Sequence, residues 1–341
     1  MSDLTYPPVF GVGLAGPALA PSERRALEAH PPRAVILFRR NIESVEQVLA
    51  LTGDIRKLPG RPRICVDQEG GPVDRFRDLL GPSISFREAA ASGVARRAGE
   101  LAGEACAALG FDVDLAPVAD RLLPGASERV LRDRCASGDP ALVIRASLDF
   151  LAGLHARGVG GCVKHFPGLG RANLDTHKEL PLIPPDPEEE ERDLAPFEAT
   201  MTSARAVMIS HAAGPDGAPA SLSSARATGL LRGSLGFTGA AFSDDLEMGA
   251  LSAFGPLPER CVVAARAGCD LLFVCSRIEE YPDCVEKVSR EVPPVRLAEA
   301  SARLDAYVMH LDEIRRAASI PKLPLAGLMA DIAALRALSE V

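Results

Sequence analysis

The sequence lacks three features that would place it in other classes of protein. No block of lysine or arginine occurs, and the formal net charge of the 341 residues is -8 at pH 7. Binding to nucleic acid or anionic lipid is therefore not expected, because both need concentrated positive charge. About 18 consecutive apolar residues, the minimum for a membrane-spanning helix, are found nowhere. The first residues also lack the basic and apolar segments of a signal peptide. We expect a soluble, cytoplasmic, monomeric protein with a small-molecule partner.

The cysteines lack the spacing of a metal site or a redox motif. Eight are present, no two form a C-x-x-C pair, and Cys65, Cys162 and Cys275 lie within apolar runs. Free cysteine behaves as a small apolar residue in protein cores. We therefore expect reduced, buried thiols and no cofactor or metal, with zinc binding as the alternative.

Eight short, β-rich apolar runs recur along the chain. Helix-like segments rich in Ala, Leu, Arg and Glu lie between them, for example at 43–58 and 140–158. Strands of a parallel sheet are buried on both faces and therefore read as continuous apolar runs. Eight strand-helix alternations predict the α/β class and a single (β/α)8 TIM-type barrel, with an open doubly wound sheet as the alternative. The runs begin at Val9, Ala34, Arg63, Phe111, Gly160, Ala206, Gly239 and Asp270.

The length fits one such barrel, which commonly needs about 250 residues or more. We expect a single catalytic domain over 1–341, with its core at about 8–318 and a C-terminal helical tail at 319–341. A helix is expected from Val292 to about Arg316. The acidic run from Asp186 predicts the beginning of another helix, because carboxylates are stabilised near a helix N-terminus. Left-handed C-caps are expected where glycine separates a helix from a strand, at Gly110, Gly158 and Gly268.

Polar side chains gather where four of the predicted strands end, in the motifs DQEGG, KHFPG, SHAAG and SDDLEM. Catalytic groups of a barrel lie at the carboxyl ends of its strands, because the loops there converge on one mouth. Only one of Asp244 and Asp245 is expected to face this mouth, because successive side chains of a strand point to opposite faces. The sequence thus predicts an active site that contains Asp67, Lys164, His165, His211 and Asp244.

Structural roles are the alternative for several of these residues. Lys164 and His165 could simply pair with a barrel carboxylate, since buried charges are usually paired. His211 could be a core histidine whose hydrogen bonds are satisfied. A metal-dependent enzyme that uses Asp67 and Glu69 is a further possibility, but the histidines show no shared ligand spacing.

The ordered set of motifs resembles glycoside hydrolase family 3, in particular its single-domain bacterial β-N-acetylglucosaminidases of the NagZ type. The resemblance spans nearly the whole chain, through ILFRRNI, VDQEGG, DLAPVAD, DRCASGDP, KHFPG, DTH, SHAAGPDGAPASLS, LGFTGAAFSDDLEM and AGCDLLFVCS. It implies that Asp244 is the nucleophile and forms a covalent glycosyl-enzyme. It also implies that His177, oriented by Asp175, is the acid/base in place of the usual second carboxylate. Contacts with sugar hydroxyls are implied for Asp67, Arg75, Arg134, Lys164 and His165, with His211 at the edge of the site.

The resemblance implies a retaining exo-β-N-acetylglucosaminidase that removes terminal β-linked GlcNAc, from cell-wall muropeptide fragments of the GlcNAc-1,6-anhydroMurNAc type. A histidine acid/base titrates near pH 6.5 and can both give and take a proton. It would not repel phosphate, so a β-N-acetylglucosaminide phosphorylase is one alternative, and a degenerate sugar-binding barrel is another. The chain departs from the family pattern at Leu169, where a second histidine is usual, at Pro72, where a basic residue is usual, and at Thr176, where serine is commoner.

Overall fold

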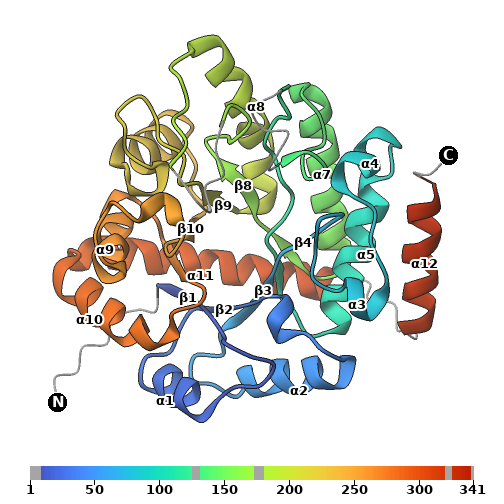
Figure 1. The fold of residues 1–341 in the computed structure, drawn as a ribbon, viewed down its shortest axis with the longest axis horizontal. Coiled ribbons are helices and arrows are strands. Elements are labelled where there is room, and N and C mark those ends of the chain that lie inside the picture. The colour runs from blue at the N-terminus through green and yellow to red at the C-terminus, as the bar shows by residue number, and fades with distance from the viewer. Residues whose placement is uncertain (1–8, 125–130, 173–179, 319–324, 339–341) are drawn as a thin grey trace.

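The computed structural model describes residues 9–124, 131–172, 180–318 and 325–338 (Figure 1). Within them the main sheet has nine strands in the order β7-β6-β3-β2-β1-β11-β10-β9-β8. Each neighbouring pair in this order is parallel. The strands are β1 (Phe10–Gly13), β2 (Ala34–Leu37), β3 (Arg63–Val66), β6 (Val113–Asp114), β7 (Gly160–Gly161), β8 (Val163–Phe166), β9 (Ala206–Ile209), β10 (Ala240–Asp245) and β11 (Leu271–Val274).

The two edges of this sheet meet in the chain itself. β7 pairs with β6, β8 pairs with β9, and only Cys162 separates β7 from β8. Counted together, β7 and β8 are the fifth of eight strand positions, and each of the eight predicted apolar runs supplies one position. The predicted (β/α)8 barrel is therefore confirmed.

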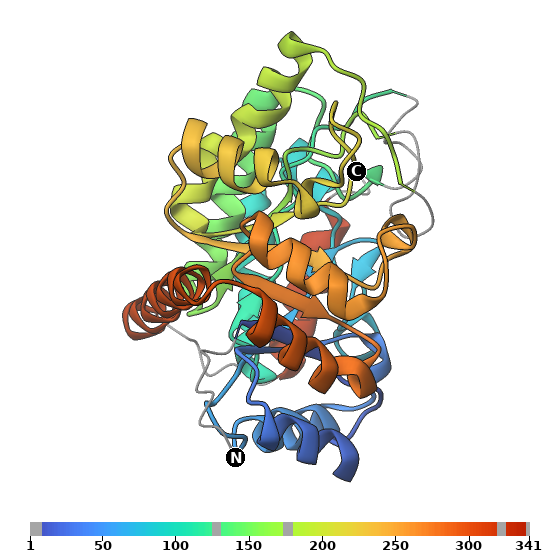
Figure 2. The same cartoon turned by 90° about the vertical axis from the view of Figure 1, so that its left-hand side faces the viewer.

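Helices surround the strands, as the helical spacing between the apolar runs predicts (Figures 1 and 2). The predicted start at Asp186 is confirmed, since its side chain caps α8 by accepting from the backbone N–H of Glu189 at 3.2 Å. Gly110, Gly158 and Gly268 have positive φ, as expected for their C-caps. The helices are α1 (Pro21–Ala29), α2 (Val45–Ile55), α3 (Arg77–Leu80), α4 (Phe86–Ala91), α5 (Ala95–Ala108), α7 (Pro140–Ala156), α8 (Pro187–Ala204), a π-type helix (Ala225–Ser234), α9 (Leu257–Ala267), α10 (Tyr281–Glu291), α11 (Pro294–Ala317) and α12 (Leu325–Ala337).

Helix α11 covers the amino-terminal ends of the strands, and Figure 1 shows it crossing behind them. The carboxylate of Asp305 lies 2.8 Å from Arg33, which precedes β2. The carboxylate of Asp312 lies 2.8 Å from Arg63, the first residue of β3. The hydroxyl of Tyr307, in the same helix, donates to the carbonyl oxygen of Gly161 at 3.0 Å. One end of the barrel is thus closed, which leaves the carboxyl ends of the strands for a site.

The core is apolar and continuous, and all eight cysteines are buried free thiols, as predicted. The last helix, α12, buries Leu328, Ile332 and Leu335 and contacts α5 and α3. An ion pair of 2.8 Å between Arg97 and Asp331 adds to this contact. No helix in the described part of the chain is long and apolar enough to cross a membrane.

Candidate active site

A cavity of about 330 Å³ lies at the carboxyl ends of the strands. Its volume is at the lower end of the range of small-molecule sites, about 300–1,000 Å³. Apolar side chains such as Phe38, Leu169, Met208, Met248 and Phe273 form part of its wall. Six of the predicted site residues line it together: Asp67, Arg75, Arg134, Lys164, His165 and Asp244.

Side chains of alternating charge form a chain along one wall of the cavity. Lys164 Nζ lies 2.6 Å from Asp67 Oδ1 and 2.6 Å from Glu69 Oε1. Arg75 Nη2 lies 3.6 Å from the other Asp67 oxygen. Burial would lower the pKa of Lys164, but Asp67 and Glu69 raise it above its usual value. Lys164 is therefore charged, and the structural pairing considered for it does occur, inside the cavity.

Arg134 continues this chain of charges. It donates from Nε and Nη2 to the two oxygens of Glu69, at 2.7 and 3.0 Å. Burial would raise the pKa of Glu69, yet Arg134 and Lys164 hold it well below its usual range. Both oxygens of Glu69 are therefore occupied by cations, a geometry that does not favour the metal-binding role considered for this residue.

The DQEGG motif folds into a small hairpin of β4 (Gln68–Gly70) and β5 (Val73–Asp74). Gln68 holds it together: its amide nitrogen donates to Asp74 at 2.8 Å, and its amide oxygen accepts from the backbone N–H of Arg75 at 2.9 Å. Arg75 is thereby brought to the cavity. Its Nε is buried and has no hydrogen-bond partner within the described residues, so it has a donor to offer a ligand.

Asp120 fixes the segment that follows β8. It accepts from the ring Nδ1–H of His165 at 2.6 Å and from the backbone N–H of Leu169 at 2.7 Å. His165 Nε2 lies 3.3 Å from Arg134 Nη2. A guanidinium has only donors, so Nε2 accepts there and Nδ1 carries the proton. Asp120 thus sets both the tautomer and the ring orientation of His165.

The expectation for Asp244 and Asp245 was wrong in one respect, because both line the cavity. The pairing of β10 with β11 shifts register between Phe242 and Asp245, so three residues of β10 advance against two of β11. Such a bulge breaks the alternation of side chains along a strand. Asp245 donates its backbone N–H to Asp244 Oδ1 at 2.8 Å. Burial raises the pKa of the Asp245 carboxyl to about 7, and the charge of Glu247 adds to this rise.

His211 is fully buried and is not among the residues that line the cavity. Its Nε2–H donates to the carbonyl oxygen of Asp245 at 2.8 Å, and its Nδ1 lies 2.7 Å from the Ser221 hydroxyl. Burial lowers its pKa, in keeping with a neutral ring. The geometry therefore favours a role in holding the backbone beside Asp244 over the direct sugar contact implied for His211.

The remaining predictions concern the loop after β8 and the departures from the family pattern. Asp175 and His177 lie outside the described residues. Leu169 is 5% exposed and packs in a small apolar cluster that includes Val118, Leu131 and Ala212. Pro72 is exposed between β4 and β5 and does not line the cavity.

Two buried carboxylates of this region, Asp114 and Asp120, were missed, and a third, Glu69, was considered only as a metal ligand. Glu69 and Asp120 bond to predicted site residues. Asp114, at the end of β6, accepts from the backbone N–H of Gln68 at 2.8 Å. Burial raises the pKa of Asp114 to about 8, and the charges of Asp67 and Glu69 add to this rise. An aspartate inside an apolar strand run, as in FDVDLAPV, was the available signal for Asp114.

A closed (β/α)8 barrel whose carboxyl-end cavity is lined by carboxylates, cations and a histidine is typical of an enzyme that acts on a small, polar, hydroxyl-rich molecule. Residues 14–311 match the Glycosyl hydrolase family 3 N terminal domain. The chain belongs to this family and is a glycoside hydrolase.

Relatives of known name support the assignment. A β-hexosaminidase from Stenotrophomonas maltophilia strain K279a is 36% identical over 295 residues, which are 82% of this chain and 86% of that protein. A β-hexosaminidase from Xanthomonas campestris pv. campestris strain B100 is 39% identical over 278 residues, 77% of this chain and 83% of the relative.

Solved structures show the same fold. NagZ from Neisseria gonorrhoeae, in complex with N-trifluoroacetyl-D-glucosamine, superposes with a TM-score of 0.82 at 28% identity and covers 98% of this chain and 99% of that one. A family 3 β-N-acetylglucosaminidase from Paenibacillus sp. str. FPU-7 gives a TM-score of 0.84 at 28% identity. That alignment covers 95% of this chain, which spans only 66% of the Paenibacillus protein.

Proposed function

We propose that the chain is a retaining exo-β-N-acetylglucosaminidase that cleaves terminal β-linked GlcNAc. The observation that carries the proposal is the cavity in which Asp244 lies together with Asp67, Arg75, Arg134, Lys164 and His165. The relatives named β-hexosaminidase and the NagZ structure with a bound N-acylated glucosamine analogue support the choice of sugar.

Sugar recognition follows from the donors and acceptors of the cavity wall. Arginine and lysine only donate hydrogen bonds and aspartate only accepts them, so neighbouring hydroxyls can be both donors and acceptors against this wall. Arg75 Nε can donate to one of two neighbouring hydroxyls, and the Asp67 carboxylate can accept from the other. Phe38, Met208 and Met248 give the cavity apolar surface against which the ring can pack.

In the proposed reaction, the Asp244 carboxylate attacks the anomeric carbon while the glycosidic oxygen receives a proton and leaves. A covalent glycosyl-aspartate then reacts with water, and the anomeric configuration is retained. The backbone N–H of Asp245 donates to Asp244 Oδ1 at 2.8 Å, which helps to orient the attacking carboxylate. His177 is proposed as the acid/base and Asp175 as its partner, on the family resemblance alone.

The first test is release of a chromogenic aryl group from its β-N-acetylglucosaminide, beside the matching glucoside, with and without phosphate. We expect release from the N-acetyl substrate only, without a need for phosphate, and its loss in Asp244→Asn. His177→Ala should lose turnover far more than it loses sugar binding. A sugar phosphate product would indicate a phosphorylase, and folded protein that binds sugar without turnover would indicate a binding barrel.

The natural substrate is proposed to be a muropeptide fragment of cell-wall turnover that carries GlcNAc on 1,6-anhydroMurNAc, cleaved in the cytoplasm by a monomer. Incubation with this disaccharide, followed by chromatography, should yield free GlcNAc. Chitobiose is the control substrate, because it presents the same terminal sugar on a different leaving group. Light scattering on the purified protein checks the monomer.

A further inference from the structure

One buried carboxylate joins two cations that reach the cavity from distant parts of the chain. Glu69 in β4 bonds to Arg134, which follows β6, and to Lys164 in β8. The side chains of Glu69 and Lys164 are each 2% exposed. Solvent screens buried charges little, so loss of one partner leaves the others strongly unbalanced.

We propose that Glu69 is a positioning residue for sugar recognition, which holds Arg134 and Lys164 in the orientation that binds the terminal sugar. This inference rests on the proposed function, because it assumes that the two cations contact the sugar. Glu69 acts through them, since its own oxygens are filled by the Arg134 fork and the Lys164 ammonium.

The two cations depend on Glu69 to different degrees. Lys164 has a second carboxylate, Asp67, at 2.6 Å. For Arg134, Glu69 is the one carboxylate within 4.0 Å in the described part of the chain, and the other contact is the ring of His165 at 3.3 Å. Removal of the Glu69 charge should therefore release Arg134 most, and should leave Lys164 paired.

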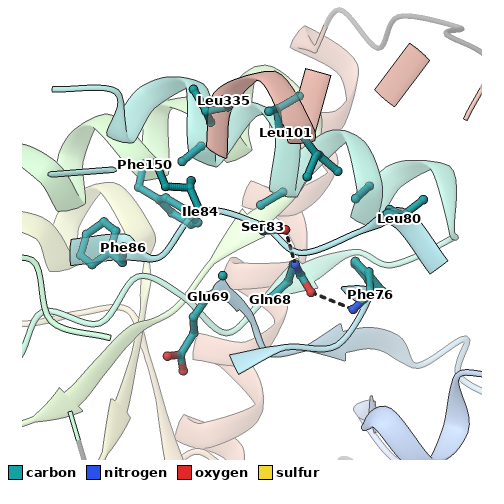
Figure 3. A pocket seen from close by; sticks show the side chains of 15 residues that line it. Gln68, Glu69, Phe76, Leu80, Ser83, Ile84, Phe86, Leu101, Phe150 and Leu335 are labelled. Carbon is teal, nitrogen blue, oxygen red and sulfur yellow. Dashed lines mark hydrogen bonds between the residues drawn. The ribbon is translucent and has the colours of Figure 1, made fainter. Parts of the chain in front are cut away.

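The backbone of β4 is held in place, so the Glu69 side chain extends toward the cavity from a fixed position. Figure 3 shows the carboxylate pointing away from the apolar side chains, among them Leu101 and Leu335, that surround a small void of about 20 Å³. The void has room for about one water molecule and for no larger ligand. Gly70 has φ 83°, and a Cβ there would lie 2.2 Å from the carbonyl oxygen of Ile84. The β4–β5 hairpin therefore packs directly against the backbone at Ile84.

The test compares Glu69→Gln, which keeps the shape and removes the charge, with Glu104→Gln. Glu104 is also buried and lies 3.7 Å from Arg157, but it does not line the cavity. We expect E69Q to raise KM for the aryl β-N-acetylglucosaminide by about 10- to 100-fold, the usual effect of one lost charged hydrogen bond, with a smaller change in kcat. The dissociation constant of free GlcNAc should rise in parallel. E104Q should leave all three quantities unchanged.

A double-mutant cycle tests whether Glu69 acts through Arg134. E69Q should raise KM much less in an R134Q background than in the wild type, because the side chain that it positions is already absent. Glu69→Asp keeps the charge but shortens the reach, and should give an intermediate KM; it also serves if E69Q does not fold.

Three outcomes would overturn the inference: an unchanged KM in E69Q, fully additive effects in the cycle, or an equal rise of KM in E104Q. These differ from failure of the proposed function, in which the wild type itself would neither hydrolyse the substrate nor bind GlcNAc. That result would overturn both.

Discussion

The imidazole of His211 donates from Nε2 to the carbonyl oxygen of Asp245 at 2.8 Å, and this bond fixes the backbone on the C-terminal side of Asp244. The ring is held in turn by Ser221 at Nδ1. The backbone N–H of the same residue, Asp245, donates to the carboxylate of Asp244, the proposed nucleophile. A histidine that does not touch the cavity is thus placed to affect the chemistry inside it.

His211→Ala should therefore lower kcat by about tenfold or more and change KM little, because Asp244 loses orientation while the sugar contacts remain. Steady-state kinetics on the aryl β-N-acetylglucosaminide measure both constants. Ser221→Ala, which removes only the hydroxyl at Nδ1, should show a smaller loss of kcat. A rise in KM without loss of kcat would instead indicate that His211 contacts the substrate.

The barrel could be predicted from the sequence because each buried parallel strand is a continuous apolar run, and because helical segments separate the runs. The site could be predicted in part, since Asp67, Lys164, His165 and Asp244 each stand at a strand end. Arg75 and Arg134 came from the family resemblance, and the structure brings both to the same cavity.

The rest depended on pairings between distant residues. Glu69 meets Arg134, 65 residues away, and Asp120 meets His165, 45 residues away. No local pattern reports such contacts. No sequence pattern indicates the register shift in β10 either, and this shift brings Asp245 to the cavity beside Asp244. Asp175 and His177 lie outside the described residues and stay predictions.

Leu169 should be needed for packing where the family usually has histidine. It packs among Val118, Leu131 and Ala212 and also forms part of the cavity wall, so Leu169→His would replace these apolar contacts with an imidazole. We expect the free energy of unfolding to fall by about 1–3 kcal/mol, the usual cost of a buried polar group without a partner. Leu169→Met, of similar volume, should cost less than about 1.5 kcal/mol. Denaturant unfolding measures both, and an L169H as stable as the wild type would contradict the prediction.

Asp114 should make the wild type less stable as pH rises. Its pKa is raised to about 8 in the fold, against about 3.9 in an unfolded chain. The folded state therefore favours the protonated acid, and its contribution is complete below pH 4 and is lost as pH rises toward 8.

Asp114→Asn stays neutral at every pH. Its free energy of unfolding should rise relative to that of the wild type by roughly 1 kcal/mol per pH unit between pH 5 and 8. Urea unfolding at several pH values measures this difference. Asp78→Asn, at an exposed position, is the control and should show no such trend. A difference between D114N and wild type that stays constant with pH would show that Asp114 is ionised throughout.

A histidine pair between α7 and α11 should weaken the fold in acid. The rings of His155 and His310 meet edge to face with centroids 5.6 Å apart, and neither Nε2 has a hydrogen-bond partner within the described residues. Burial lowers the pKa of His155 to about 4, and the charge of His310 adds to this effect. Burial also lowers the pKa of His310.

The unfolded chain takes up a proton near pH 6.5, whereas folded His155 resists it down to about pH 4. Stability from this residue is therefore complete above pH 6.5 and is lost as pH falls through this window. Between pH 7.5 and pH 5, the free energy of unfolding should fall by about 1–2 kcal/mol less in His155→Gln than in the wild type. Unfolding of both proteins at the two pH values measures the difference, and each protein at pH 7.5 is its own control. Parallel acid losses in H155Q and wild type would mean that the proton is taken up elsewhere, because a neutral glutamine has no charge to acquire.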